Sequence, residues 1–495
     1  MRKLDWRFIG GNAAAAAVLA VVAAGGFDLP ALLSAFAAPL APTGAAFAIA
    51  GQLRWAAGTI AAFLFLRAFG VFRLFPRRRF AAALARGSPA AWGAAVFALA
   101  LVLRLVYAVF AAAPPVSDEG CYAALADAVA AGRGLVGDDG PTAYWPVGYV
   151  AFLAGSFRAF GSSFIPVIIA QALLGAGTAA LVVPLGERFV GQAGARAGGL
   201  LLALWPSQVA YAARVFPAVA SAFLIVAAAY FILIRSGYGA GAAAGLLAGL
   251  ATLVLPAAAL LPVALGVADW LASRRPGRAL GRAAVAAAVA AAVVAPWTWR
   301  NWRAFGAFIP VSTNGGVNLW MGNNPHANGS YYYPTSRKNP LFMTEGELAR
   351  DRVGKELAWY FIRTQRERVA LLLVPKFAYL FGADISAFQL EDVARGGTTA
   401  AGARGVPARV AQTYYALACL GFILTLVAAR RRIFREAGGL AAPAALLIVP
   451  AYLTLVYLAF FGQDRFHAPM LPFVAILAGA ALAGGAAPPE RKPGG

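Results

Sequence analysis

The sequence predicts an all-α membrane protein that crosses the bilayer many times, and three observations carry this prediction. Of the 495 residues, 61% are hydrophobic, whereas soluble domains contain about 45–50% apolar residues. The mean hydropathy is +0.70. Apolar runs recur along the whole chain, and each transmembrane helix needs about 20 such residues. We therefore expect about 12–14 transmembrane helices, joined on one side by loops that carry surface helices.

The basic residues set the expected orientation. The net charge of +22 gathers in short arginine clusters beside apolar runs, which is typical of the cytoplasmic loops of membrane proteins. This pattern indicates attraction to anionic lipid and not to nucleic acid. Cys121 lies in a loop and Cys419 in an apolar run, so neither a structural disulfide nor a thiolate metal site is expected. The clusters lie at 77–79, 274–282 and 430–435.

The first part of the chain leads to an acidic loop. We expect a hairpin of helices at about 8–26 and 45–70, and then a helix at 92–113 that runs outwards. The loop that follows, 114–145, has only one basic residue against five acidic ones, although the chain as a whole is strongly basic. The five are Asp118, Glu119, Asp127, Asp138 and Asp139.

A short helix is expected within this loop. Ser117 is a suitable cap for a helix of about 118–131. Because Tyr122, Leu125 and Val129 share one face of that helix, we expect it to lie along the membrane surface.

The middle of the chain reads as a series of apolar helices. If each helix crosses the membrane in turn, Arg188 and the 274–282 cluster lie on the cytoplasmic side and Arg300 lies on the outer side. On this interpretation 146–160 is a short re-entrant or tilted helix; alternatively it spans the membrane, and 239–272 is one helix kinked at Pro256. The expected segments are 163–185, 196–213, 216–235, 239–254, 256–272 and 282–300.

A polar region and three last helices complete the expected organisation. Thr344 and Glu347 have the spacing of a capping box for a helix of about 345–365. The apolar run 369–381 is too short to span comfortably, so we expect it to be re-entrant or interfacial. Helices follow at 408–428, 440–460 and 467–485. The expected units are an N-terminal hairpin with its basic loop (1–91), a transmembrane core (92–300), an outer region (301–407) and C-terminal helices (408–495).

Several motifs in this order resemble the GT-C superfamily of glycosyltransferases. They are the Asp-Glu pair at 118–119, the Trp-Pro-Val-Gly-Tyr run at 145–149, the Asn- and Gly-rich run at 311–325, and the Asp-Arg-Phe-His-Ala-Pro run at 464–469. The most similar groups are the bacterial relatives of protein O-mannosyltransferases and of lipid A aminoarabinose transferases, and the resemblance runs from about residue 92 to 485.

The resemblance implies a reaction and a catalytic residue. Such enzymes pass a sugar from a polyprenyl-phosphate donor to an acceptor outside the cytoplasmic membrane, with Asp118 in the position of the catalytic carboxylate. This sequence departs from the family pattern at three places, and at each of them the relatives carry residues of the donor site. The aminoarabinose transferases carry Glu-Lys where this chain has Tyr144 and Trp145, and many relatives have an acidic residue near Phe216 and an Arg-Pro at Leu255 and Pro256.

Asp118 and Arg465 are the main candidates for the chemistry. A carboxylate in a partly desolvated pocket is able to take the proton of an acceptor hydroxyl. The alternative is structural: the negative charge of Asp118 would stabilise the positive N-terminal end of the helix that begins there. Arg465 matches phosphate oxygens in bidentate geometry. Glu119 is a second catalytic candidate, as a helper of Asp118, with a structural role as the alternative. Further candidates for substrate binding are Lys376, Tyr122, His467 and Arg300.

No cofactor is required by the sequence. The two histidines, His326 and His467, lack the spacing of a metal motif, so no metal ligand is assigned, and a divalent metal held by Asp118 and one histidine is left as an alternative.

The sequence thus predicts an integral glycosyltransferase in a bacterial inner membrane, with its active site facing the periplasm. Its partners would be a polyprenyl-phosphate-linked sugar, a periplasmic acceptor (lipid, glycan or protein) and membrane lipid, and transfer would invert the anomeric centre. Two rival hypotheses stay open: a lipid-linked sugar flippase or transporter, and a non-catalytic protein of envelope assembly. A transporter predicts ionisable residues near mid-membrane, whereas here they concentrate at one face.

Overall fold

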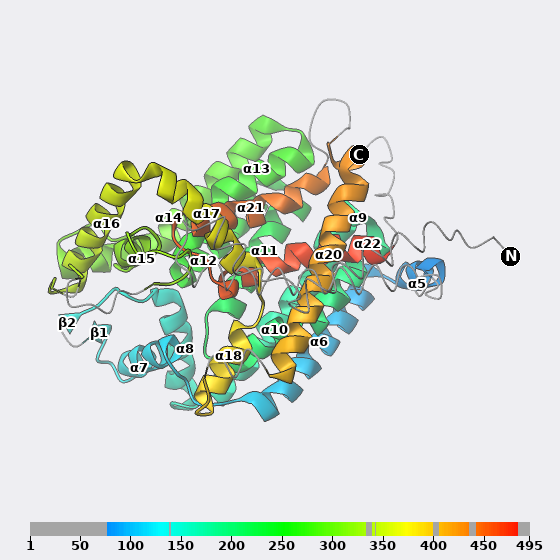
Figure 1. The fold of residues 1–495 in the computed structure, drawn as a ribbon. Helices are drawn as coiled ribbons and strands as arrows, with labels where there is room; N and C mark the ends of the chain where they lie inside the picture. The colour runs from blue at the N-terminus through cyan, green and yellow to red at the C-terminus, as the bar shows by residue number, and fades with distance from the viewer. Residues whose placement is uncertain are drawn as a thin grey trace, which may run out of the picture.

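The computed structural model describes residues 77–137, 140–332, 339–341, 343–398, 405–434 and 442–483. These residues form helices almost throughout, with one short hairpin of strands (Figure 1). The predicted all-α class is confirmed. The predicted helices at 8–26 and 45–70 lie outside the described residues.

The elements follow one another in a simple order. In the first half they are α5 (Arg77–Leu84), α6 (Pro89–Ala111), α7 (Asp118–Ala130), β1 (Val136–Gly137), β2 (Gly140–Pro141), α8 (Val147–Phe160), α9 (Ile165–Leu204), α10 (Pro206–Ala210), η1 (Tyr211–Ala213), α11 (Ala218–Ile234), α12 (Gly237–Val254), η2 (Pro256–Ala258), α13 (Leu261–Ser273) and α14 (Pro276–Phe305). In the second half they are α15 (Gly315–Gly322), α16 (Glu347–Thr364), α17 (Arg366–Phe381), α18 (Ser386–Ala394), α20 (Val406–Phe434), η3 (Ala442–Ala444), α21 (Ala445–Ala459), η4 (Asp464–Met470) and α22 (Leu471–Leu482).

Many of these helices are long and apolar enough to cross a membrane. Six described helices pass this test alone, and up to eight if each of two bent pairs is one span. Three shorter apolar helices, α8, α13 and α21, stand beside them. The chain is therefore a multi-pass membrane protein.

Helix α9 is a hairpin of two helical arms. Gly191 has a non-helical backbone (φ 76°, ψ 169°), and only glycine adopts such a conformation readily. The arms pack face to face, because a Cβ on Gly186 would lie 2.9 Å from the Cβ of Ala195. The two helices predicted here are thus present, but the second ends at Leu204 and not at 213: Pro206 starts the separate helix α10, because proline cannot continue a helix interior.

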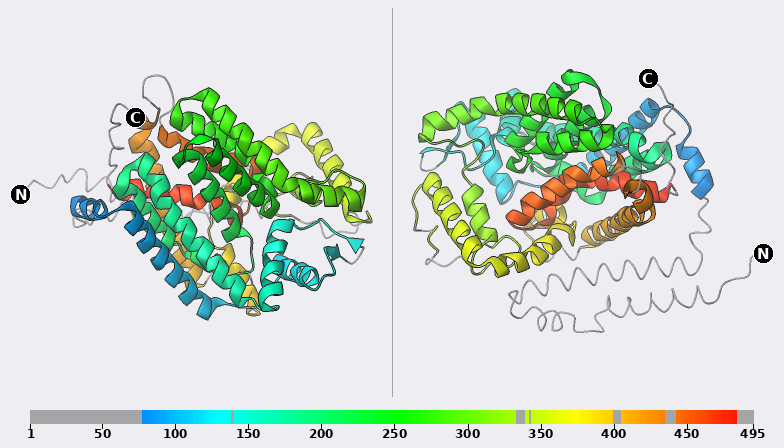
Figure 2. Two further views of the ribbon diagram at one scale, coloured as in Figure 1. Left: turned by 180° about the vertical axis from the view of Figure 1, so that it is seen from behind. Right: turned by 90° about the horizontal axis from the view of Figure 1, so that it is seen from above.

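Helices α12, α13 and α14 lie side by side (Figure 2). A Cβ on Gly241 would meet Arg282, and one on Gly245 would meet Ala286, so α12 and α14 run in the same direction. Helix α13 pairs with the start of α14 in the opposite direction. The chain therefore reverses at Pro256, and the alternative of one kinked helix over 239–272 is wrong.

The expected inner residues gather at one end of the bundle. Arg282 donates to the carboxylate of Asp269 at 2.8 Å and to the carbonyl of Arg235 at 3.0 Å, and Arg188 donates to the carbonyl of Leu233. Helix α5 packs on α9 next to the turn at Gly191. The hairpin β1–β2 and helix α16 lie at the far end of the molecule from α5 (Figure 1).

The polar region over 301–407 is built of α15 to α18. Helix α16 confirms the predicted helix at about 345–365, but the predicted capping box is wrong. The chain enters α16 through Gly346, Thr344 donates to the carbonyl of Pro340, and Glu347 accepts bonds from the first loop. The run 369–381 ends in a bend of 67° between α17 and α18, which agrees with a segment that does not cross the membrane straight.

Candidate active site

A cavity of about 390 Å³ opens where three distant parts of the chain meet. These are the start of α7, in the acidic loop, the start of α15, in the region expected outside, and the turn η4. Aromatic side chains form a large part of the wall. The aromatic lining residues are Tyr122, Tyr144, Trp145, Phe216, Tyr331, Tyr457, Phe461 and Phe466.

Asp118 and Arg465 face each other in this cavity. Nη1 of Arg465 lies 2.9 Å from Oδ2 of Asp118, and the two side chains are 20% and 33% exposed. They are the only charged residues among those described that line the cavity. A carboxylate and a guanidinium are thus brought together from positions 347 residues apart.

The backbone at Ser117 turns sharply to present Asp118. Helix α7 begins at Asp118, as expected, but the predicted cap is wrong: the Ser117 side chain makes no capping bond, and its φ is 52°. A positive φ on a residue other than glycine is uncommon and costs free energy. Glu119 instead bonds back to the segment before the helix, because its carboxylate accepts from the backbone N–H of Val116 at 3.1 Å.

Glu119 is buried below the cavity in an ion pair. Its carboxylate accepts from Nε of Arg214 at 2.9 Å and from Nη2 of the same arginine. Both side chains are fully buried, and neither lines the cavity. The pair ties α7 to the segment before α11 and so fixes the start of the helix that carries Asp118. No sequence pattern linked these two residues.

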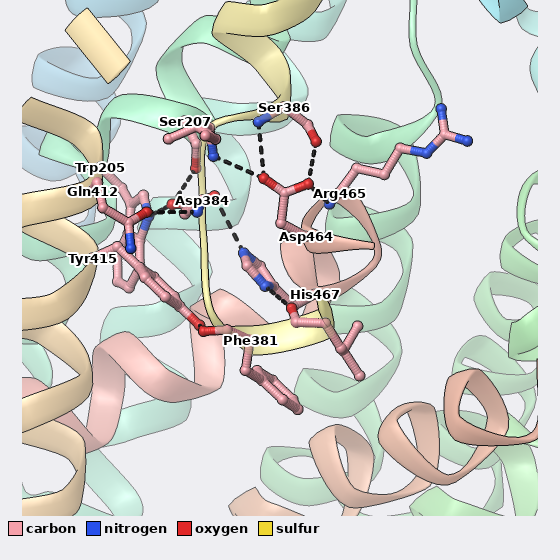
Figure 3. Close-up of polar contacts among 12 residues, drawn as sticks. Trp205, Ser207, Phe381, Asp384, Ser386, Gln412, Tyr415, Asp464, Arg465 and His467 are labelled. Atoms are coloured by element: carbon pink, nitrogen blue, oxygen red, sulfur yellow. Dashed lines mark hydrogen bonds and ion pairs between the residues drawn. The ribbon is translucent and has the colours of Figure 1, made fainter. Parts of the chain in front are cut away.

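Arg465 is held in place from two sides, and Figure 3 shows one of them, the bonds made by the neighbouring Asp464. The preceding residue, Asp464, accepts from the backbone N–H groups of Ile385 and Ser386 at 2.8 and 2.9 Å. The guanidinium lies over the ring of Phe216 at 5.3 Å and that of Phe466 at 5.5 Å, a cation–π arrangement. Its Nε is buried and has no partner among the described residues, so the guanidinium retains a donor for a ligand.

A buried network under this turn was not predicted. Asp384 accepts from the indole N–H of Trp205 and the hydroxyl of Ser207, both at 2.7 Å. The imidazole of His467 connects two groups (Figure 3). Its Nε2 lies 3.2 Å from Oδ1 of Asp384, and its Nδ1 lies 2.6 Å from the carbonyl oxygen of Leu380. The network joins α10, α17 and η4. Only the Asp-Arg-Phe-His run at 464–467 gave any signal of it.

The other candidates fall into two groups. Tyr122 lines the cavity; burial, more than the nearby Asp118, raises the pKa of its phenol, so it stays protonated and can donate a hydrogen bond. His467 is fully buried and does not line the cavity. The same holds for Lys376, which donates to Asn323 at 3.0 Å and to the carbonyl of Leu458 at 3.1 Å.

Arg300 supports the first loop. It donates to the carbonyls of Thr142 and Leu135 at 3.0 and 2.9 Å, and Glu347 accepts from the backbone N–H of Ala143 at 2.8 Å. The loop is thereby attached to α14 and α16. Arg300 does not line the cavity, so its contact to this site is indirect.

The three departures from the GT-C pattern all lie in the cavity wall. Tyr144, Trp145, Phe216, Leu255 and Pro256 are lining residues. The positions that supply charged groups in relatives therefore supply aromatic and apolar surface here. Within the described residues, no group of three or more His, Cys, Asp or Glu side chains is placed to hold a metal ion.

No protein-family model matches the chain, and no curated protein matches it. Solved structures do resemble it. The oligosaccharyltransferase of Archaeoglobus fulgidus in its apo form has a TM-score of 0.48 and 15% identity, with 79% of this chain and 50% of that protein covered; its complex with an inhibitory peptide and a dolichol-phosphate has a TM-score of 0.47, 15% identity, and 79% and 50% coverage. ArnT of Cupriavidus metallidurans bound to undecaprenyl phosphate has a TM-score of 0.40 and 17% identity, with 80% and 78% covered.

Both proteins are GT-C glycosyltransferases, the superfamily that the sequence motifs resemble. This chain spans about half the length of the archaeal enzyme. With TM-scores below 0.5, these likenesses assign no donor, acceptor or residue role to this chain.

Proposed function

We propose that the protein is a membrane glycosyltransferase that moves a sugar from a polyprenyl-phosphate donor to an acceptor on the outer side of a bacterial inner membrane. The observation that carries this proposal is the pairing of Asp118 with Arg465 in an aromatic cavity. One group suits a proton acceptor and the other a phosphate, and the arginine clusters predict that both face the outer side.

The reaction is a direct displacement at the anomeric carbon. An acceptor hydroxyl attacks this carbon, the bond from it to the phosphate oxygen breaks, and Asp118 takes the hydroxyl proton. The polyprenyl phosphate leaves with its negative charge beside Arg465, which stabilises it electrostatically. One displacement inverts the anomeric configuration.

The ion pair couples donor binding to the base. In the free protein Arg465 neutralises Asp118. A donor phosphate competes for the guanidinium, whose buried Nε has no partner among the described residues. The phosphate then shares Arg465 with Asp118, which weakens the ion pair, and its negative charge makes the carboxylate of Asp118 more basic and able to accept a proton.

The remaining candidates receive supporting roles. Tyr122 contributes a donor in the cavity, Glu119 fixes the start of α7, His467 fixes the turn that carries Arg465, and Arg300 and Lys376 brace the surrounding loops. A divalent cation on Asp118 is an alternative way to neutralise the phosphate. Loss of transfer on chelation, with recovery on adding metal, would favour it over Arg465.

The experiment that tests this function is lipid analysis of a deletion strain. We expect a polyprenyl-phosphate sugar to accumulate and an envelope glycan to lack that sugar, because the donor would no longer be consumed. Reintroducing the wild-type chain should reverse both changes, and reintroducing the Asp118→Asn variant should reverse neither. Full rescue by Asp118→Asn would favour a flippase or an assembly protein instead.

A further inference from the structure

The cavity carries little charge beyond the two groups that the proposed function already uses. Among the described lining residues, Asp118 and Arg465 are the only ionisable acid and base at neutral pH, and they neutralise each other at 2.9 Å. The polar remainder consists of amides and hydroxyls, including Asn314, Asn318 and Ser221. Such groups bind neutral hydroxyls by hydrogen bonds and leave a charge uncompensated.

The aromatic wall offers flat apolar surfaces to a ligand. The rings of Tyr457 and Phe466 stack with centroids 4.5 Å apart and planes 5° apart. The ring centroid of Phe461 lies 5.5 Å from that of Phe466 and 5.6 Å from that of Tyr331. The electron-rich face of an aromatic ring attracts the weakly positive C–H groups on one face of a sugar ring. This wall therefore suits a sugar ring that also needs partners for its hydroxyls.

Gln463 places an unused acceptor beside this wall. It lines the cavity two residues before Arg465, and its Oε1 is buried without a hydrogen-bond partner among the described residues. A buried acceptor left unpaired costs about 1–3 kcal/mol. A ligand hydroxyl that donates to this oxygen would remove that cost.

We propose that the transferred group is an uncharged sugar, and that Gln463 selects it by accepting a hydrogen bond from one of its hydroxyls. This inference rests on the proposed function and adds the class of sugar and a specificity residue. The cavity discriminates against both charged classes. An amino sugar would bring an ammonium group that competes with Arg465 for Asp118, and a sugar acid would bring a carboxylate that competes with the phosphate for Arg465.

Competition binding with the purified full-length protein in lipid nanodiscs tests this inference. The probe is radiolabelled polyprenyl phosphate, and the competitors are three synthetic polyprenyl-phosphate sugars that carry a neutral hexose, an amino sugar or a uronic acid. We expect the neutral donor to compete at least about tenfold better than either charged donor, because each charged sugar lacks a free partner in the cavity.

Variants at Gln463 sharpen the test. Gln463→Leu keeps a similar volume and removes the acceptor, and we expect it to weaken the neutral donor about tenfold while leaving unglycosylated polyprenyl phosphate unaffected. Gln463→Glu adds a carboxylate and should shift preference toward the amino-sugar donor. Gln365→Glu is the matched control, because Gln365 is exposed and lies outside the cavity; its preferences should equal those of the wild type.

The outcomes separate the two proposals. If polyprenyl phosphate itself fails to bind to correctly folded protein, the proposed function is wrong. If it binds but a charged donor competes as well as the neutral one, the function stands and the neutral-sugar inference is wrong. If the neutral donor is preferred equally by wild type and Gln463→Leu, the sugar class stands and Gln463 loses its role.

Discussion

The chemistry that we propose for this protein depends on two side chains that lie far apart in the sequence and meet in one cavity. Asp118 and Arg465 were separately identifiable, one as a carboxylate in an acidic loop and the other as an arginine in a polar turn. Their contact at 2.9 Å was not identifiable, because a distance between residues 347 positions apart depends on every helix between them. Lys376, another candidate cation, is buried and donates to Asn323 and to the backbone carbonyl of Leu458 instead.

We expect Arg465→Ala to weaken use of the lipid donor by about tenfold to a hundredfold. Removing one bond to a charged group costs on the order of 1.5–3 kcal/mol, and about 1.4 kcal/mol corresponds to a factor of ten. Arg465→Lys should lose less, because it keeps the charge without the bidentate geometry. Steady-state kinetics with varied donor measure both effects. Unchanged donor kinetics in Arg465→Ala, together with impaired kinetics in Lys376→Ala, would move the phosphate role to Lys376.

At the scale of elements, helix α7 owes its position to a buried ion pair. We expect Glu119→Gln to lower the free energy of unfolding by about 3–5 kcal/mol, because it leaves the buried Arg214 without its counterion. Replacing both residues, in Glu119→Leu with Arg214→Met, should recover much of this loss. Thermal unfolding in detergent measures the change. A Glu119→Gln variant that is as stable as wild type but inactive would make Glu119 part of the chemistry.

The contact between α8 and α12 is a second element that shapes the cavity. A Cβ on Gly148 would lie 2.7 Å from backbone atoms of Leu253 and Val254, and Val254 lines the cavity. We expect Gly148→Ala to destabilise the fold by about 1–3 kcal/mol, as overpacking does. Gly155→Ala on the same helix is the matched control, because a Cβ there meets nothing within 4 Å. Equal unfolding temperatures for the two variants would contradict this packing.

At the scale of the whole molecule, the arginine clusters predict which end faces the cytoplasm. His326 and Gly277 are both exposed, and the arginine clusters predict opposite sides of the membrane for them. In a background without Cys121 and Cys419, we expect His326→Cys to react with a membrane-impermeant thiol reagent in intact spheroplasts. Gly277→Cys should react only after the membrane is opened. Labelling of Gly277→Cys from outside would reverse the orientation and the location of the site.

Much of the architecture followed from the sequence, because apolar length and arginine position act locally. The helices after residue 92, the reversal at Pro256 and the broken segment after 369–381 were all within reach of such reasoning. The caps were not: Ser117 and Thr344 have the right residue type, but Ser117 makes no capping bond and α16 begins after Gly346 instead of after Thr344. The pairs Glu119–Arg214 and His467–Asp384 were also inaccessible, because each depends on three-dimensional packing.

The measurement that tests the central claim most directly is sugar transfer by the purified wild type and by Asp118→Asn in proteoliposomes. Asparagine keeps the size of the side chain and removes the base. We expect wild-type protein to transfer sugar from a polyprenyl-phosphate donor, and Asp118→Asn to lose at least about a hundredfold in turnover while it still binds polyprenyl phosphate and unfolds at the wild-type temperature. Turnover in Asp118→Asn close to that of the wild type would contradict the account.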